Sequence, residues 1–165
     1  MRNNQAKIIA LGGMMAALAV TIMCLGALIP LATFLCPVLC ILLEQFVLKN
    51  CGSRIGWAWY GAVAILSLLL GPDKEAAAVF AFLGYYPMLK PKLDAMKLGI
   101  LLKLVLFNAS VLVMYWLLIY LFGMAQIAQE YTEMGVVMTA VTLVLGNVTF
   151  FMLDHVLAKK LRRRY

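Results

Sequence analysis

The chain has 165 residues, of which 65% are hydrophobic and 13% charged. A water-soluble domain averages about half apolar and about a quarter charged residues, so this composition excludes that class and predicts an integral membrane protein. The formal net charge of +7 does not indicate nucleic-acid binding, because the basic residues stand in short groups between apolar runs rather than beside aromatic residues. They are typical of topology signals and contacts with lipid headgroups.

The first apolar run covers residues 8–29 and follows two basic residues, Arg2 and Lys7. As a helix it would be about 33 Å long, which is enough to cross the hydrocarbon core. A signal peptide begins similarly, but its apolar core is usually about 7–15 residues and ends at a small-x-small cleavage site. We therefore expect this run to be a transmembrane helix of the mature protein.

Residues 31–47 and 55–70 predict the second and third crossing helices. Cys36 and Cys40 would share a helix face, which is the spacing of a two-ligand metal site. We interpret them as packing residues, because no His or carboxylate was identified at ligand spacing. Glu44 stands one turn from Lys49, so we expect an interfacial or ion-paired role for it.

A charged turn, a short apolar segment and a Tyr85-Tyr86-Pro87 break follow the third helix. The segment at residues 76–89 would span only about 21 Å as a helix, which falls short of the hydrocarbon core. Irregular backbone at membrane depth is tolerated where it lines a cavity, so we expect a binding site nearby. Asp73, Lys74 and Glu75 are candidate ligand contacts at the head of this segment; the alternative is a solvated turn.

Residues 98–122 and 134–153 predict the last two helices, joined by an outer loop without Lys or Arg. Asn108 and Asn147 would lie at comparable depth if these helices run antiparallel. Either they bond to each other across the bundle or they contact a ligand, for which Trp116 would offer a flat apolar surface. Lys103 lies one turn from the inner end of its helix and can extend to the interface.

The basic residues fix the expected topology, because Lys and Arg in loops stay cytoplasmic. With six crossings, Lys74 alone would be external, and twelve basic residues would be cytoplasmic: Arg2, Lys7, Lys49, Arg54, Lys90, Lys92, Lys97, Lys159, Lys160, Arg162, Arg163 and Arg164. The sequence therefore predicts an all-α, polytopic protein, a single domain with six transmembrane helices and both termini in the cytoplasm.

Catalytic signatures were not identified. The single histidine, His155, follows Asp154, but neighbours in a helix point about 100° apart and no Ser or Cys partner is evident. We therefore expect no enzyme activity, catalytic residue, cofactor or bound metal.

The first helix carries small residues at close spacing: Gly12, Gly13, Ala16 and Ala17. They form two overlapping small-xxx-small pairs, which let another helix approach closely. The partner would be a helix of this same protein or of another subunit.

With this first helix, KIIALGGMMAALAV, six apolar segments and cytoplasmic termini, the chain resembles the substrate-binding S component of energy-coupling-factor (ECF) transporters. The resemblance implies that Gly13 and Ala17, with Gly12 and Ala16 as neighbours, dock on a transmembrane coupling subunit that cytoplasmic ATPase subunits drive. It also implies a small-molecule ligand, a vitamin-like nutrient or a metal, held toward the extracellular side.

We therefore expect a multi-pass protein of the plasma membrane, in contact with lipid, that binds a small nutrient for uptake. The alternative is a non-transporting membrane protein that stabilises or scaffolds a larger complex through the same face of the first helix. Copurifying ATPase subunits and a bound small molecule would favour the first function.

Overall fold

The computed structural model describes every residue except 1, 27–31, 121–122, 124 and 163–165. Throughout this part of the chain the regular secondary structure is helical, which confirms the predicted all-α fold. The helices are α1 (Arg2–Gly26), α2 (Ala32–Cys51), α3 (Ser53–Leu70), α4 (Lys74–Leu83), α5 (Tyr86–Asp94), α6 (Gly99–Tyr120) and α7 (Ala125–Arg162).

Five helices are long and apolar enough to cross a membrane, as judged by length and composition among the described residues. The spans are Gln5–Gly26, Thr33–Cys51, Ser53–Leu70, Gly99–Tyr120 and Ala140–Ala158. Large apolar side chains such as Ile9, Leu69 and Ile100 are more than two-thirds exposed on these helices. In water such a surface would be unfavourable, so the outward faces fit lipid and the chain is a multi-pass membrane protein.

The short segment predicted at residues 76–89 is divided between two helices. α4 has 10 residues and α5 has 9, so α4 extends only about 15 Å. α4 ends at Leu83, and α5 begins at Tyr86 with a proline in its first turn, a position where proline removes no helical hydrogen bond. The break falls at the predicted Tyr85-Tyr86-Pro87 sequence, while α5 continues into the predicted loop.

The last helix is longer than predicted. α7 has 38 residues and begins at Ala125, so it includes most of the stretch that the sequence analysis assigned to an outer loop. The residues concerned, AQIAQEYTE, are polar but rich in Ala, Gln and Glu, which favour helix. Polarity therefore marked the end of an apolar segment and not the end of the helix.

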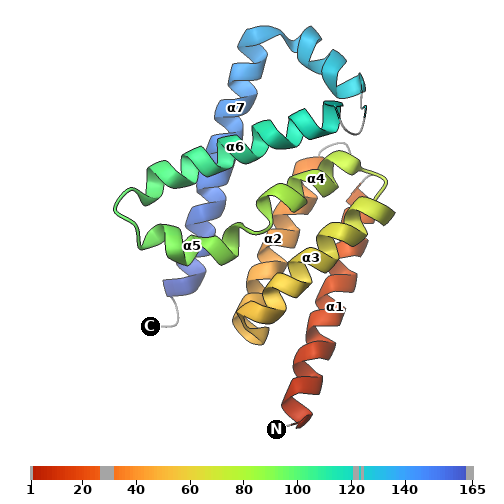
Figure 1. Ribbon diagram of the computed structural model, residues 1–165, viewed down its shortest axis with the longest axis vertical. Helices are drawn as coiled ribbons and strands as arrows, with labels where there is room; N and C mark the ends of the chain where they lie inside the picture. Colours follow the sequence, from red (N-terminus) through yellow and green to blue (C-terminus); the bar gives the residue numbers. More distant parts are fainter. Residues whose placement is uncertain (1, 27–31, 121–122, 124, 163–165) are drawn as a thin grey trace. The chain divides into compact units, whose positions relative to one another are not determined.

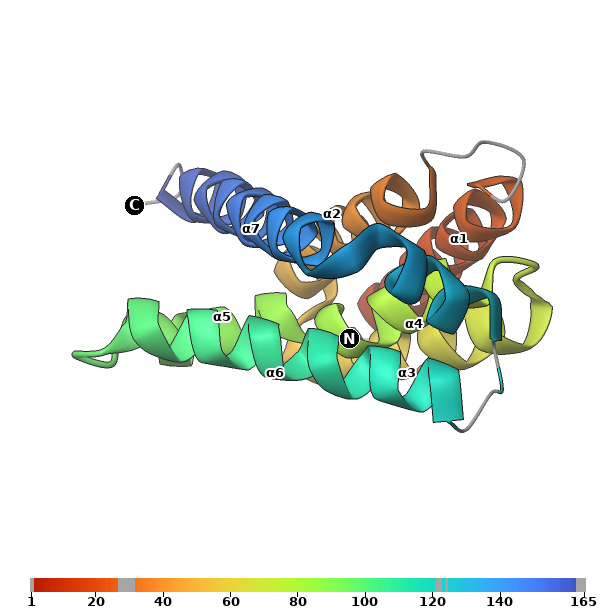
Figure 2. The ribbon, with the colours of Figure 1, turned by 90° about the horizontal axis from the view of Figure 1, so that it is seen from above.

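Internal contacts divide the chain into two compact units, Met1–Ala95 and Met96–Tyr165. In the first unit α2 packs against α1, α3, α4 and α5, and α1 and α2 lie side by side (Figure 1 and Figure 2). In the second unit α6 packs against α7.

Small side chains allow the helices of the first unit to approach closely. Ala76, Ala77 and Ala78 are all buried in α4. Gly12 of α1 lies against Ile55 of α3, because a Cβ added there would be 3.7 Å from Ile55 Cγ2. The first unit is therefore held together by close backbone approach, as in many membrane helix pairs.

Candidate functional site

Asp73 organises the turn between α3 and α4. It is the N-cap of α4, where its Oδ1 accepts a hydrogen bond from the Ala76 backbone N–H at 3.0 Å. Its Oδ2 accepts a hydrogen bond from Thr33 Oγ1 on α2 at 2.8 Å. This carboxylate therefore ties the start of α4 to the start of α2.

Lys74 and Glu75 complete the turn. The Lys74 ammonium donates to the backbone carbonyls of Leu68 at 2.8 Å and Gly71 at 2.9 Å, where a cation complements the C-terminal end of α3. Glu75 stands in the first turn of α4, where a negative charge is favourable. The three residues predicted as ligand contacts lie together, and their role toward a ligand stays a prediction.

We predict that Asp73→Ala destabilises the first unit by roughly 1–3 kcal/mol, because it removes an N-cap and a side-chain hydrogen bond. Thermal unfolding of the detergent-solubilised protein measures the loss. Asp73→Asn is the matched control, since its amide oxygen can still cap α4. Equal losses for Ala and Asn would show that capping contributes little.

A buried polar stripe follows one face of α2 from this turn. Cys36, Cys40 and Glu44 succeed one another at helical spacing, and Cys40 Sγ approaches the Ala19 carbonyl oxygen of α1 at 3.6 Å. Glu44 therefore does stand at ligand spacing from Cys40, which the sequence analysis overlooked. Even so, the described residues contain no group of three or more His, Cys, Asp or Glu side chains that could hold a metal ion.

Glu44 is completely buried, and neither of its carboxylate oxygens has a hydrogen-bond partner in the described part of the chain. The expected ion pair with Lys49 is therefore not formed, while an interfacial position stays a prediction. The reason is geometric: residues five apart on a helix point about 140° apart, so Lys49 stands on another side of α2. A buried carboxylate without a partner is costly and is a functional candidate by default in a membrane.

Aromatic side chains surround this part of the first unit. The Tyr60 ring packs at centroid distances of 5.9 Å from Phe80 and 6.4 Å from Tyr85. The Tyr60 hydroxyl donates to the Ala81 carbonyl oxygen and lies within electrostatic range of Glu44. Trp59 packs edge-on to Phe80 at 6.3 Å.

Two further buried polar atoms belong to α3. Trp59 Nε1 and Ser67 Oγ have no hydrogen-bond partner among the residues described. Most buried polar groups in proteins are paired, so Glu44, Trp59 and Ser67 together make the interior of the first unit unusual. The Trp59 side chain is 4% exposed.

In the second unit, Asn108 and Asn147 pair reciprocally. Asn108 Nδ2 donates to Asn147 Oδ1 at 3.0 Å, and Asn147 Nδ2 donates to Asn108 Oδ1 at 3.2 Å. Each amide also donates to the carbonyl four residues earlier, at 2.8 Å. These bonds match the cross-helix alternative, while a ligand role for either residue stays a prediction.

Trp116 is 58% exposed and its ring lies 5.6 Å from that of Tyr120. His155 is exposed on α7, the helix that packs against α6. It is one of the residues that line an open apolar depression. The depression is lined by Val144, Asn147, Val148, Phe151, Met152, His155 and Val156. The role of Trp116 toward a ligand is likewise still a prediction.

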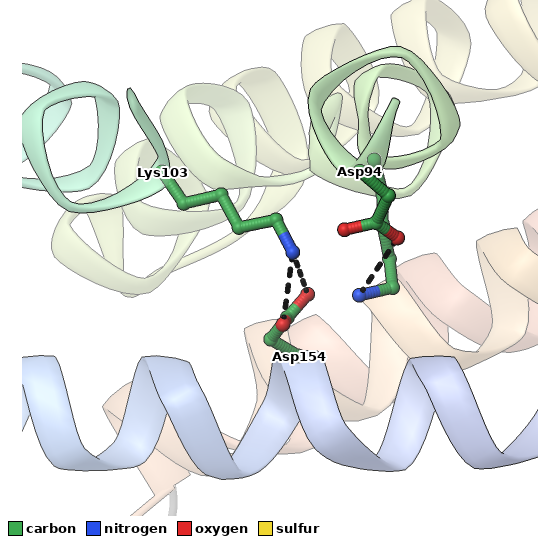
Figure 3. A network of polar contacts seen from close by, with 4 residues as sticks. Asp94, Lys103 and Asp154 are labelled. Atoms are coloured by element: carbon green, nitrogen blue, oxygen red, sulfur yellow. Dashed lines mark hydrogen bonds and ion pairs between the residues drawn. The ribbon is translucent and has the colours of Figure 1, made fainter. Parts of the chain in front are cut away.

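An ion pair between α6 and α7 was missed by sequence reasoning. The Lys103 ammonium points at the Asp154 carboxylate, with Nζ 3.1 Å from Oδ2 and 3.3 Å from Oδ1 (Figure 3). The two residues are far apart in the sequence, and a local signal for their pairing does not exist. Lys103 is therefore buried within the second unit and bound to Asp154, while its extension to the interface stays a prediction. In the first unit, Lys90 pairs with Asp94 at 3.5 Å.

Comparison with known protein families, curated proteins and solved structures finds no match to this chain.

Proposed function

We propose that this chain is the substrate-binding membrane subunit of an ECF-type transporter, which takes up a small nutrient across the plasma membrane. Its five apolar helices support a multi-pass protein. In the proposed topology α4 and α5 together form a sixth, broken crossing, and both termini are cytoplasmic, as the distribution of basic residues indicates. Broken helices are a recurrent feature of membrane transporters.

The exposed small-residue face of α1 is the observation that carries this proposal. Gly13 and Ala17 are exposed one turn apart, and a Cβ added at Gly13 would meet no atom within 4 Å. Gly12, in contrast, is buried against α3, and Ala16 is half-buried. The face formed by Gly13 and Ala17 is thus smooth and turned outward, which suits close approach of a helix from another subunit.

We predict that Gly13→Leu and Ala17→Trp each abolish copurification of the coupling and ATPase subunits from membranes of the native organism. The added side chain would separate the two helix backbones at their contact. The protein should still insert and fold, because both positions are exposed on the first unit. Affinity purification of tagged protein followed by mass spectrometry provides the measurement.

Ala62→Trp is the matched control, since Ala62 is an exposed small residue on α3. It should leave copurification unchanged. If wild-type protein brings down other membrane proteins but neither ATPase subunits nor a small molecule, the scaffold function replaces the transporter function. If the Ala62 variant loses the same partners, the effect is not specific to α1.

A further inference from the structure

We propose that Glu44 is a proton-binding site in the interior of the first unit, which holds its proton while α2 is packed against α3 and α4 and releases it when they separate. The proposal stands on the geometry of the first unit and does not depend on the proposed transporter role.

Glu44 is enclosed within the first unit. Its side chain has no exposed surface, and both carboxylate oxygens lack hydrogen-bond partners within the described structure. It belongs to the apolar span Thr33–Cys51. An ionised carboxylate in such surroundings loses its hydration and gains nothing in exchange. Binding a proton removes that charge, so the packed state favours the neutral carboxyl.

Within the described part of the chain, the groups near Glu44 offer it no positive charge. The titratable groups within electrostatic range are the Cys40 thiol on α2 and the Tyr60 phenol on α3. Tyr85, at the junction of α4 and α5, packs on Tyr60. None of these groups can neutralise a carboxylate at neutral pH.

The described charged groups on the helices that pack against α2 make no hydrogen bond with Glu44. Lys7 on α1 and Arg54 on α3 are exposed. Lys74 on α4 is bonded to carbonyls of α3, and Glu75 stands in the first turn of α4. On α5, Lys90 pairs with Asp94 and Lys92 is exposed. The proton is therefore the positive charge that the packed unit can supply to Glu44.

Separation of the helices admits water and lets the carboxyl ionise, so proton release and opening are coupled. The reaction is a simple dissociation, in which the carboxyl O–H bond breaks and the proton passes to water. A hydrated glutamate has a pKa of about 4.3. Above that pH, the ratio of open to packed protein should rise by up to about tenfold per pH unit while the packed form stays protonated.

The Cys40 thiol provides a built-in probe of opening. It is fully buried one turn from Glu44 on the same face of α2, so an alkylating reagent reaches it only after the helices separate. The experiment follows N-ethylmaleimide labelling of Cys40 in the full-length protein in lipid nanodiscs, by peptide mass spectrometry, from about pH 6 to about pH 8. Glu44→Gln is the matched variant, because it keeps the thiol and the shape but cannot ionise.

We expect the Cys40 labelling rate of the wild type to rise with pH by up to about 100-fold more than that of Glu44→Gln over this interval. Cys24 on α1, which is half-buried, serves as an internal reference for the reactivity of the thiol itself. The same pH dependence in both proteins would overturn the proposal.

A second measurement uses the wild type alone and so does not require the variant to fold. Infrared spectroscopy should show the carbonyl stretch of a protonated carboxyl at neutral pH that is shielded from deuterium exchange. This band should weaken only at the higher pH where the open form becomes the major one. Absence of the band at neutral pH would overturn the proposal even if Glu44→Gln cannot be purified.

Discussion

Lys103→Met is expected to destabilise the second unit by about 3–5 kcal/mol, the usual cost of removing one partner from a buried ion pair. The substitution leaves the Asp154 carboxylate, which is 17% exposed, without the ammonium 3.1 Å away. Both residues belong to apolar spans, Gly99–Tyr120 and Ala140–Ala158, where an uncompensated charge is expensive. Denaturant titration in detergent micelles, monitored by the fluorescence of Trp116, measures the loss.

A double-mutant cycle separates the pair from the effect of losing a lysine. Asp154→Leu should cost a similar amount, whereas Lys103→Met combined with Asp154→Leu should recover much of the stability, because both charges of the pair are then removed. Lys92→Met provides the control for an exposed lysine and should have little effect. Additive losses in the double variant would show that the ion pair contributes no stability.

Gly84→Leu is expected to destabilise the first unit by about 1–3 kcal/mol through overpacking. A Cβ at Gly84 would lie 2.6 Å from the Phe80 carbonyl oxygen, 3.0 Å from Tyr60 Cε2 and 3.1 Å from Phe80 Cε2. The backbone oxygen cannot move without disturbing α4, and the two rings already pack on each other. The loss should appear as a lower midpoint in thermal unfolding and weaker protection of the α4 amides from hydrogen exchange.

Gly61 supplies the matched control in the same unit. A Cβ at Gly61 would meet no atom within 4 Å, so Gly61→Leu should be neutral or slightly stabilising, since leucine favours helix over glycine. Comparable losses at both positions would mean that flexibility of glycine, and not the close approach of Tyr60 and Phe80, explains the effect at Gly84.

The fold class was accessible from the sequence because the signals for membrane helices are local. Long apolar runs between basic groups predicted the helices that end at Gly26, Cys51, Leu70 and Tyr120 to within a few residues. The Tyr85-Tyr86-Pro87 break was also visible, because proline disfavours a helix interior and is well tolerated in the first turn of a new helix. The sequence did not reveal that a regular helix, α5, resumes after it.

The interior of the candidate site was less accessible, because it depends on pairing between distant residues. Lys103 and Asp154 meet only through the packing of α6 on α7, and their spacing in the sequence carries no information about it. Glu44 was misread for a different reason: its nearest basic neighbour along the chain, Lys49, lies on another side of α2. Its four-residue spacing from Cys40 was the overlooked signal that would have placed it on the same, buried face.

The length of α7 has a mechanical consequence. Measured along the helix, its 38 residues cover about 57 Å, nearly twice the thickness of the hydrocarbon core of about 30 Å. Its apolar span, Ala140–Ala158, occupies half of that length, and the first turns of α7 bend away from the rest of the helix (Figure 1). Because these first turns join the apolar span through helical backbone and not through a loop, a displacement of them acts directly on the part of α7 that crosses the membrane.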